Sequence, residues 1–530
     1  MLSILIVGTA WFTVGALGRA APTQASRDVR TGEALRTAKN ALLAHVAKYA
    51  ALATTNEPGQ LPCPESVTLA NEGEASAACS SSLLVVGRLP WKTLGVDQLR
   101  DGAGEPLWYA VQGFRAAPVN FGTPGLLSVN GGAVVAVIIA PGQPLNTAAQ
   151  AGTPPAGCSK LNQVAASRNV APLNPDHYLE CGTASGVFAS PGDALWTNDR
   201  IVTITANEWA DAIAGPIADR LQRQVAPAME DFRSTISLAS WGQRYLPNAS
   251  LFNSLATNPP SNDLCGTNNT REGMPPTASA TSVACNTNWS GGSVSGLGAL
   301  LSSSGCSPNA TELRCSFLVL LGGIASPSVS ITAPRIGYSF RSFNPADVRI
   351  EVNGGAPQSV TVQNYNSSVS SASGGTATVS FQLVFPLLSI ADNVVVIVPH
   401  PKDAFQADPR MQWFLNNGWD RFVYYSVARA VTSDPGSDVC TSGVFTDCLT
   451  VNGLPSPANN KRLVLTLMGP RASAGQTWPG SSVSQYLEAQ NSTPADRIYE
   501  VKPVDTAFND RIATCPRQET ASSGSVTLCN

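Results

Sequence analysis

The first fifty residues carry two consecutive apolar patterns. Residues 1 to 18 are uncharged and mostly apolar, although they fall short of the roughly 20 residues of a spanning helix. Apolar residues then recur at helical spacing from Ala34 to Leu52. We therefore expect a transmembrane anchor that continues into an amphipathic helical stalk over residues 1–55. The alternative is a cleaved signal peptide, because Arg19-Ala20-Ala21-Pro22 resembles a signal peptidase site.

After the stalk, short apolar runs alternate with turn residues, which predicts β-strands. The first of these strands are expected near Trp108–Val111, Leu126–Val129, Val134–Ile139 and Ile201–Thr205, with Asn130-Gly131 as a hairpin turn. Thr205 and Glu208 form a capping box, which predicts that a helix starts there. The core-facing positions of that helix follow at intervals of four: Trp209, Ile213, Ile217, Leu221 and Val225.

Four short motifs occur twice along the chain in the same order. The first set is Trp108-Tyr109-Ala110-Val111, Leu127-Ser128-Val129-Asn130-Gly131, Tyr178-Leu179-Glu180 and Asn198-Asp199-Arg200-Ile201. The second set is Tyr424-Tyr425-Ser426-Val427, Leu449-Thr450-Val451-Asn452-Gly453, Tyr486-Leu487-Glu488 and Asn509-Asp510-Arg511-Ile512. Four motifs in one order are improbable by chance, so the sequence predicts a duplicated domain.

The region between the two copies has a different pattern. Residues 240–314 are rich in Ser, Asn, Thr and Gly, which predicts a loop-rich segment that contains cysteines. Residues 315–400 contain six apolar runs and an Asn353-Gly354 turn, which predict an inserted all-β sandwich. Residues 403–419 have a helical pattern.

The predicted fold class is therefore α+β, with a long N-terminal helix, two copies of an antiparallel β head domain and the inserted sandwich. The expected domains are 1–55 (anchor and stalk), 60–239 (first copy with a C-terminal helix), 240–314 (loop-rich segment), 315–400 (sandwich) and 401–530 (second copy). A chain of 530 residues is too long for one core, which agrees with several domains.

Composition argues against one class of partner and indicates the type of cellular compartment. Charged residues make up 13% of the chain and the net charge is −3, without a basic block, so nucleic acid is not an expected partner. Twelve cysteines occur as neighbouring pairs without the spacing of a zinc site, which predicts disulfides in an oxidising compartment. Free buried thiols are the alternative. The candidate pairs are Cys63 and Cys79, Cys158 and Cys181, Cys265 and Cys285, Cys306 and Cys315, Cys440 and Cys448, and Cys515 and Cys529.

The first copy also resembles a known group of proteins. The motifs are Ala38-Lys39-Asn40-Ala41-Leu42-Leu43, Leu61-Pro62-Cys63-Pro64, Gly87-Arg88-Leu89-Pro90-Trp91-Lys92-Thr93-Leu94-Gly95, Trp108-Tyr109-Ala110-Val111 and Asn198-Asp199-Arg200-Ile201. They resemble bacterial prepilin-like proteins related to type IV pilins and type II secretion pseudopilins. The resemblance covers residues 1 to about 235, and the second copy more loosely.

This resemblance implies an N-terminal helix held in the inner membrane until it packs into a filament, with a β head outside. The expected partners are then inner-membrane lipid, other pilin-like subunits and a surface ligand. Two features depart from the family pattern. No leader with a glycine cleavage site precedes the apolar stretch, and residues 1–18 contain no glutamate. The head is also larger than an ordinary pilin head, which favours a minor or tip-type subunit.

Catalytic chemistry finds little support in the sequence. The chain has three histidines, His45, His177 and His400, and a Ser-His-Asp arrangement would need one of them. Gln485 stands in the second copy where the first has His177. We expect no catalytic residues, no cofactor and no metal site, although a loop calcium site stays open because only the EF-hand pattern is excluded.

The recurring Asn-Asp-Arg motif is the strongest polar candidate: Asn198, Asp199, Arg200, Asn509, Asp510 and Arg511. It presents a carboxylate and a guanidinium to a partner, or it forms a turn that starts a strand. Recurrence in both copies favours the structural role.

Three functions follow from these observations. The first is a non-enzymatic pilin-like surface protein, inner-membrane anchored with its head in the periplasm or at the cell surface after assembly, that serves adhesion or recognition. The second is a secreted or periplasmic hydrolase with a cleaved signal peptide. The third is an anchored envelope protein without filament assembly.

Overall fold

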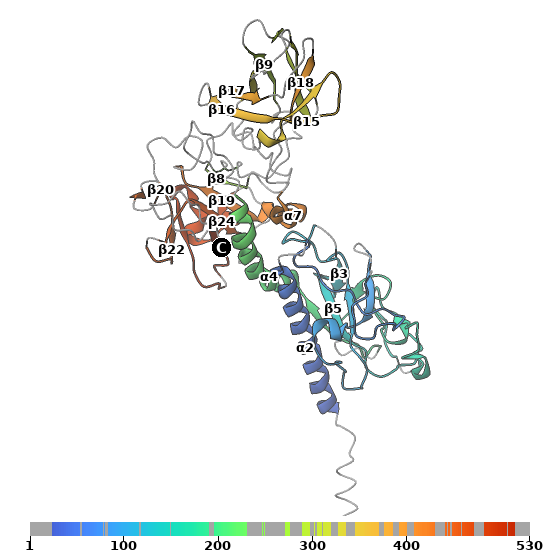
Figure 1. Ribbon diagram of the computed structural model, residues 1–530. Helices are drawn as coiled ribbons and strands as arrows, with labels where there is room; N and C mark the ends of the chain where they lie inside the picture. Colours follow the sequence, from blue (N-terminus) through green and yellow to red (C-terminus); the bar gives the residue numbers. More distant parts are fainter. Residues whose placement is uncertain are drawn as a thin grey trace, which may run out of the picture. The chain divides into compact units, whose positions relative to one another are not determined.

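A computed structural model describes most of the chain (Figure 1). The described residues are 24–52, 56–77, 79, 83–115, 118–148, 150–189, 196–229, 246, 249, 271–275, 289–296, 301–302, 305–309, 311–319, 327–334, 345–369, 376–384, 392–399, 408–429, 440–441, 444–445, 448–456, 458–470, 482–505 and 507–514. They form two compact units, Met1–Pro216 and Ile217–Asn530. Strands predominate over helices in this part of the chain, so the predicted mixed α and β class is confirmed at that level.

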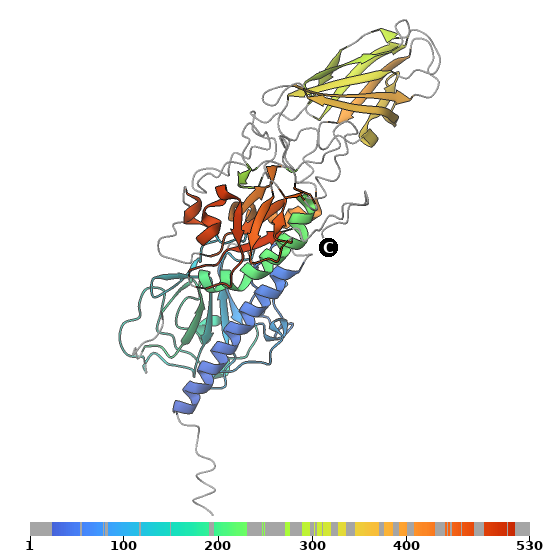
Figure 2. The same ribbon diagram turned by 90° about the vertical axis from the view of Figure 1, so that its left-hand side faces the viewer.

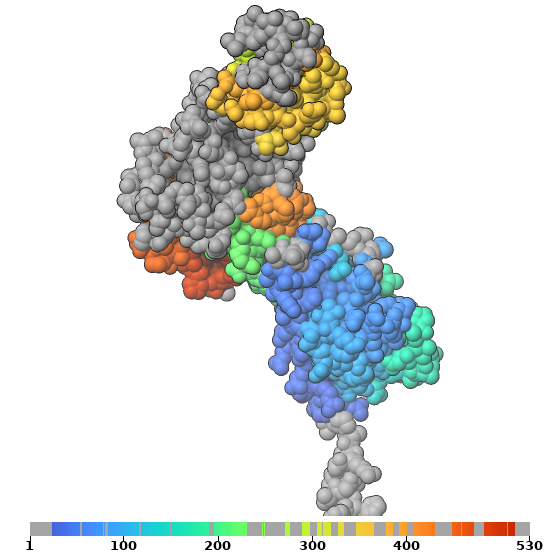
Figure 3. Space-filling model, in the orientation of Figure 1, coloured from blue at the N-terminus to red at the C-terminus, as the bar shows by residue number. Residues whose placement is uncertain are grey.

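Helix α2 (Gln24–Ala51) forms the described part of the predicted stalk. It buries one stripe of small and apolar residues: Thr31, Ala34, Leu35, Ala38, Leu42, Val46 and Ala50. This stripe packs on strands β5 and β7 of the first unit, so the helix lies along one face of the sheet (Figure 2). The other side of the helix, with Arg30, Glu33 and Arg36, is exposed. Figure 3 shows the dark blue N-terminal part of the chain at the surface of the first unit.

The predicted anchor, residues 1–18, lies outside the described residues. Within the described part of the chain, no helix combines the length and hydropathy needed to cross a membrane.

The first unit is built on an antiparallel sheet of order β1-β2-β5-β7. Its strands are β1 (Val85–Arg88), β2 (Trp108–Val111), β5 (Ala136–Ala140) and β7 (Arg200–Ile204). Every residue of β2 and β5 is buried. Strands covered on both faces are apolar throughout instead of alternating, which explains their continuous hydrophobic runs.

A small second sheet has the order β4-β3-β6, with β3 (Leu127–Val129), β4 (Gly132–Val134) and β6 (Val187–Phe188). Asn130 (φ 49°) and Gly131 (φ 82°) form the two-residue turn of the β3–β4 hairpin, as predicted. The predicted strand Val134–Ile139 is divided, because β4 ends at Val134 and the chain then enters the main sheet as β5.

The second unit contains a sheet of order β8-β19-β24-β26, also antiparallel throughout. Its strands are β8 (Glu272–Gly273), β19 (Val423–Val427), β24 (Leu463–Leu467) and β26 (Arg511–Thr514). A small sheet β23-β22-β25 accompanies it, with β23 (Asn460–Lys461), β22 (Leu449–Asn452) and β25 (Ile498–Glu500). A separate hairpin joins β20 (Cys440–Thr441) and β21 (Val444–Phe445).

The two main sheets have the same strand order and the same register. Tyr109 of β2 lies opposite Gly87 and Ile138. Tyr425 of β19 lies opposite Gly273 and Leu465. The small sheets also agree, since β3 and β22 each pair antiparallel with one neighbour and parallel with the other. The motifs that contain Tyr109 and Tyr425 therefore occupy equivalent positions in the main sheets, and the two Asn-Gly motifs do so in the small sheets.

Helix α4 (Ala206–Arg220) starts at the predicted capping box. Thr205 Oγ1 accepts the Glu208 N–H at 3.3 Å, and Glu208 Oε2 accepts the Thr205 N–H at 3.0 Å. The helix continues into a π-helical turn, η3 (Leu221–Val225). From Ile217 onward it belongs to the second unit, where η3 contacts helix α7 (Pro409–Asn416) and β26. The assignment of the whole helix to the first domain, 60–239, therefore needs correction.

The domain limits 240–314 and 401–530 also differ from the structure. Strand β8 precedes the sandwich but pairs with β19, so the second β unit begins before residue 401. The sandwich is inserted in the connection between β8 and α7. In the first unit the equivalent connection joins β1 to helix α3 (Trp91–Leu94) through only two residues, Leu89 and Pro90.

The sandwich itself starts well before residue 315. Its sheets are β10-β12-β18-β14-β15, with β11 beside β12, and β16-β17-β13-β9. The strands are β9 (Gly291–Ser295), β10 (Leu301–Ser302), β11 (Cys306–Pro308), β12 (Glu312–Val319), β13 (Ser328–Pro334), β14 (Arg349–Val352), β15 (Gln358–Ser359), β16 (Thr361–Val369), β17 (Thr376–Val384) and β18 (Asn393–Pro399). Trp289 and Val294 join one apolar core with Phe317, Phe381 and Val396. Among the described residues, four strands (β8 to β11) and the start of β12 thus lie in the segment 240–314 that was expected to be loop-rich.

Candidate functional site

The Asn-Asp-Arg motif lies immediately before and at the start of an equivalent strand in each unit. Arg200 begins β7 and Arg511 begins β26. Asp199 and Asp510 are both 3% exposed, whereas Arg200 is exposed. Burial of the aspartates agrees with the structural role that the sequence favours.

The asparagine of each motif holds a glycine turn that follows the central strand. Asn198 Nδ2 donates to the Gln143 carbonyl at 2.7 Å, and Asn509 Nδ2 donates to the Pro470 carbonyl. A Cβ on Gly142 would lie 2.6 Å from Asn198 Nδ2. Glycine is therefore required where the turn meets the asparagine.

Each aspartate of the motif pairs with the glutamate of the Tyr-Leu-Glu motif. Asp199 Oδ2 accepts the Glu180 N–H at 3.0 Å, and Asp510 Oδ2 accepts the Glu488 N–H at 2.8 Å. In both units the glutamate backbone thus meets the carboxyl group of a buried aspartate. We call Glu180–Asp199 the first acid pair and Glu488–Asp510 the second acid pair.

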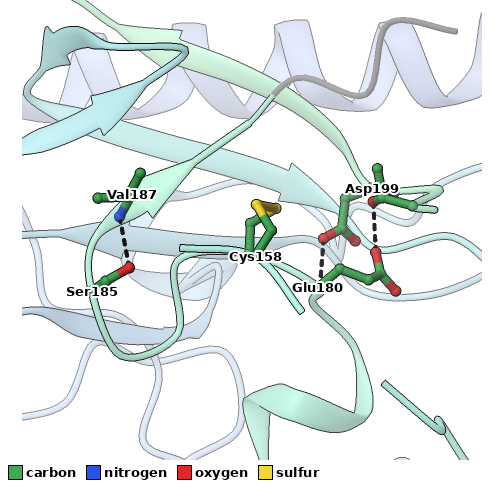
Figure 4. Close-up of a disulfide and its surroundings, with 7 residues drawn as sticks. Cys158, Glu180, Ser185, Val187 and Asp199 are labelled. Atoms are coloured by element: carbon green, nitrogen blue, oxygen red, sulfur yellow. Dashed lines mark hydrogen bonds between the residues drawn. A yellow bond between two sulfur atoms is a disulfide. The ribbon is translucent and has the colours of Figure 1, made fainter. Parts of the chain in front are cut away.

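The first acid pair lies beside a disulfide in the first unit (Figure 4). Burial, and then the charge of Glu180, raise the pKa of Asp199 well above its ordinary range. Burial also raises the pKa of Glu180, whose carboxylate accepts from Gln163 Nε2 at 2.6 Å and Thr197 Oγ1 at 2.7 Å. Burial therefore disfavours the ionised form of both carboxyl groups.

Arg168 connects the first acid pair to the surrounding loops. Its guanidinium donates to Gln163 Oε1 at 2.8 Å, to the Gly142 carbonyl at 2.8 Å and to the His177 carbonyl at 2.7 Å. It also pairs with Glu105 Oε1 at 3.2 Å, and its side chain is 1% exposed. These bonds attach the long connection between β5 and β6 to the end of the main sheet.

The second acid pair has a different neighbour. Asn491 is fully buried, and its Nδ2 donates to Asp510 Oδ2 at 3.2 Å. Burial, and then the charge of Glu488, raise the pKa of Asp510 well above its ordinary range. Glu488 Oε2 accepts the backbone N–H groups of Asn509 and Asp510, each at 3.1 Å.

A further pair of buried polar residues at equal spacing before β2 and β19 is not indicated by the sequence motifs. Asp101 lies eight residues before Tyr109, and Asn417 lies eight residues before Tyr425. Both are buried. Asp101 accepts from the Ala103, Glu105 and Gly142 N–H groups at 2.8 to 3.0 Å, whereas Asn417 donates to the Trp413 carbonyl. The equal spacing was the available signal, but the residue type differs between the copies.

The Leu-Pro-Trp-Lys-Thr-Leu-Gly motif fixes a disulfide loop. The Lys92 N–H donates to the Gly73 carbonyl at 2.8 Å, and Thr93 Oγ1 accepts the Ala75 N–H at 2.8 Å. A Cβ on Gly73 would lie 2.4 Å from the Trp91 ring. The motif thus packs the loop closed by Cys63 and Cys79 against helix α3.

Three of the candidate cysteine pairs are disulfides: Cys63–Cys79, Cys158–Cys181 and Cys306–Cys315. Cys448 is also disulfide-bonded. The side chain of Cys440 and the residues Cys265, Cys285, Cys515 and Cys529 lie outside the described part of the structure.

The two described histidines belong to separate networks. His45 on α2 stacks on Tyr49 with ring centroids 6.0 Å apart, and burial followed by the charge of Lys48 lowers its pKa. His177 Nδ1 lies 3.3 Å from the Ser167 carbonyl oxygen. His400 lies outside the described residues, immediately after the end of β18 at Pro399. Within the described ranges, no cluster of three or more His, Cys, Asp or Glu residues could hold a metal ion.

Comparison with known proteins adds no relative: no family model, curated protein or solved structure matches this chain. The family resemblance accordingly depends on the sequence motifs alone.

Proposed function

We propose that this chain is a non-enzymatic, exported pilin-like protein of the minor or tip type, anchored by its N-terminal segment and displaying a large head for adhesion or recognition. The observation that carries the proposal is that the apolar residues 1–18 stand in the sequence shortly before helix α2, which begins at Gln24. That helix supports a sheet of antiparallel strands through its small residues. An anchor joined in this way to a head is the arrangement expected of a pilin-like subunit.

The second copy supports a fused head instead of two independent subunits. Its helix, α4 with η3, follows β7 after a single residue, Thr205. It therefore has no apolar segment of its own in front of it. One anchor would carry both copies and the inserted sandwich.

The disulfides support export, because such bonds form and persist in oxidising compartments. The most perturbed carboxyl groups, Asp199 and Asp510, are buried and engaged in loop attachment. Buried carboxyls with this structural use argue for scaffold chemistry over hydrolysis, which would need groups that substrate can reach.

The anchoring step is tested by fractionation of cells that produce the protein. The full chain is expected in the membrane fraction and should resist a carbonate wash. A variant in which residues 1–18 are replaced by a cleavable export signal should become soluble in the periplasm with its disulfides intact. A soluble full chain would favour the secreted hydrolase, and a membrane-bound chain absent from sheared filaments would favour the anchored envelope protein.

A further inference from the structure

The first acid pair contains more carboxyl oxygens than hydrogen-bond donors. Glu180 Oε1 and Oε2 accept from Gln163 and Thr197, and Asp199 Oδ2 accepts from the Glu180 N–H. Asp199 Oδ1 is buried and accepts no hydrogen bond. Thr197 joins the two residues, because its Oγ1 donates to Glu180 Oε2 and accepts the Asp199 N–H. Two ionised carboxylates so close together in a buried place repel each other and leave one oxygen without a donor, and a proton relieves both costs.

The charged groups around the first acid pair also favour one bound proton. Arg168 reaches Glu180 through Gln163 and also binds Glu105. Asp101 and Arg168 both bind the backbone of Gly142. Asp101 accepts the Gly142 N–H, and Arg168 donates to the Gly142 carbonyl. Arg168 thus pairs directly with Glu105, while Asp101, Glu180 and Asp199 are buried in the same network, and an added proton reduces its excess negative charge.

The second acid pair repeats this geometry on an unrelated set of neighbours. Asp510 Oδ2 accepts hydrogen bonds from the Glu488 N–H and from Asn491 Nδ2. Asp510 Oδ1 is again buried and accepts no hydrogen bond. Glu488 Oε2 in turn accepts the Asp510 N–H at 3.1 Å, so the two carboxyl groups again meet at one junction. The common element is the carboxyl pair itself.

We propose that each acid pair holds one shared proton in the folded protein, and that this proton fastens the loop carrying the glutamate to the strand that follows the aspartate. The aspartate carries the proton on Oδ1 and donates it to the glutamate. Loss of the proton leaves two buried negative charges in contact, and the loop then separates from the sheet. This device is independent of whether the chain assembles into filaments.

The direction of the pH effect follows from proton linkage. The pKa of Asp199 is raised in the folded protein, by burial first and then by Glu180, above the unfolded value of about 3.9. The folded state therefore binds more protons than the unfolded state between these two values. The stabilisation is fully present below about pH 4 and is lost as pH rises through the folded pKa of the pair.

Hydrogen–deuterium exchange of the full chain, corrected for intrinsic rates, measures loop opening between pH 4 and pH 9. Residues 157–182, which contain Cys158–Cys181 and Glu180, report on the first pair. In the wild type we expect the equilibrium constant for opening of this loop to increase as pH is raised. The loss of one proton produces an increase of up to about tenfold per pH unit over part of this range. D199N should remove that dependence, because the amide keeps a donor without titrating.

Two controls make the test specific. D176N removes one charge from an exposed position on the same loop and should keep the wild-type profile. D510N should flatten the profile of residues 483–500 in the second unit and leave residues 157–182 unchanged. Equal pH dependence in wild type and D199N would overturn the proposal, as would a wild-type profile that is flat.

A second readout covers the case in which D199N does not fold. Infrared spectra of the wild type at neutral pH should contain the C=O band of protonated carboxyl groups, and its absence would overturn the proposal. A calcium-dependent loss of that band, with increased loop protection, would show that the pair binds a cation in place of a proton and would also overturn it.

Discussion

Arg168 illustrates how single buried side chains hold irregular structure in this protein. Its guanidinium donates to two backbone carbonyls and to the Gln163 amide oxygen, and it pairs with the Glu105 carboxylate. The guanidinium carbon Cζ also lies 4.8 Å from the centroid of the Tyr178 ring. A planar group with five donors in fixed directions suits such a junction, whereas a lysine would supply only a point charge. Arg168 therefore joins several parts of the long β5–β6 connection to one another.

Arg168→Leu should destabilise the first unit by about 3 kcal/mol, because it leaves a buried carboxylate and several carbonyls without their donor. Denaturant unfolding followed by exchange of β2 and β5 peptides measures the loss. The matched control is Arg200→Leu, which removes an exposed ion pair to Asp28 (2.9 Å) and should cost less than about 1 kcal/mol. Equal losses for the two variants would contradict the account of Arg168.

The sequence located part of this site and missed the rest for a physical reason. The repeated motifs pointed to Asp199 and Asp510 and favoured a structural role, and both motif glutamates were quoted as landmarks. The pairing of Glu180 with Asp199 depends on how a loop of irregular conformation returns to the sheet. No local periodicity encodes that return, so Gln163 and Arg168 could not be assigned from the sequence.

At the scale of secondary-structure elements, local signals were the reliable ones. The Asn130-Gly131 turn and the Thr205–Glu208 capping box act between neighbouring residues, and the structure has both. The apolar run from Val134 to Ile139 was taken as one strand, because hydrophobicity does not show where a chain passes from one sheet to another. Strands β9 and β11 were missed because Gly, Ser and Pro give them low β-propensity.

Substitution of two glycines, one in α2 and one in a loop against it, should change the stability of the first unit in opposite directions. A Cβ on Gly102 would lie 2.3 Å from the Arg27 carbonyl oxygen, where loop and helix are in contact, so Gly102→Ala should destabilise the first unit by about 1–3 kcal/mol. Gly32 lies on the exposed side of the helix with nothing within 4 Å of a Cβ. Gly32→Ala should stabilise by about 0.5–1 kcal/mol. Thermal unfolding of both variants tests the docking of α2, and destabilisation by Gly32→Ala would contradict it.

At the scale of the whole molecule, the chain combines a repeated β unit with one inserted domain. The first unit joins β1 to α3 through two residues, whereas the second unit places the entire sandwich in the equivalent connection between β8 and α7. The sandwich has its own core and its strands pair among themselves. An insertion of this kind adds a surface without disturbing the unit that carries it, which fits a role in display.

Removal of residues 276–407, bridged by a short Gly-Ser linker, should leave the second β unit folded. Cells that produce this variant should display the protein at the wild-type level but attach less well to the surfaces that the wild-type strain colonises. Antibody labelling checks the display level, and attachment counts measure the loss. Unchanged attachment at equal display would exclude the adhesive role of the sandwich.

The mature N-terminus of the native protein tests the central claim most directly. Mass spectrometry of protein purified from its own cells, searched also against sequence upstream of Met1, identifies the first residue and any modification. The account predicts a start immediately before the apolar stretch of residues 1–18, with an N-methylated first residue. A start near Ala21 would contradict the account and would indicate a protein released by signal peptidase.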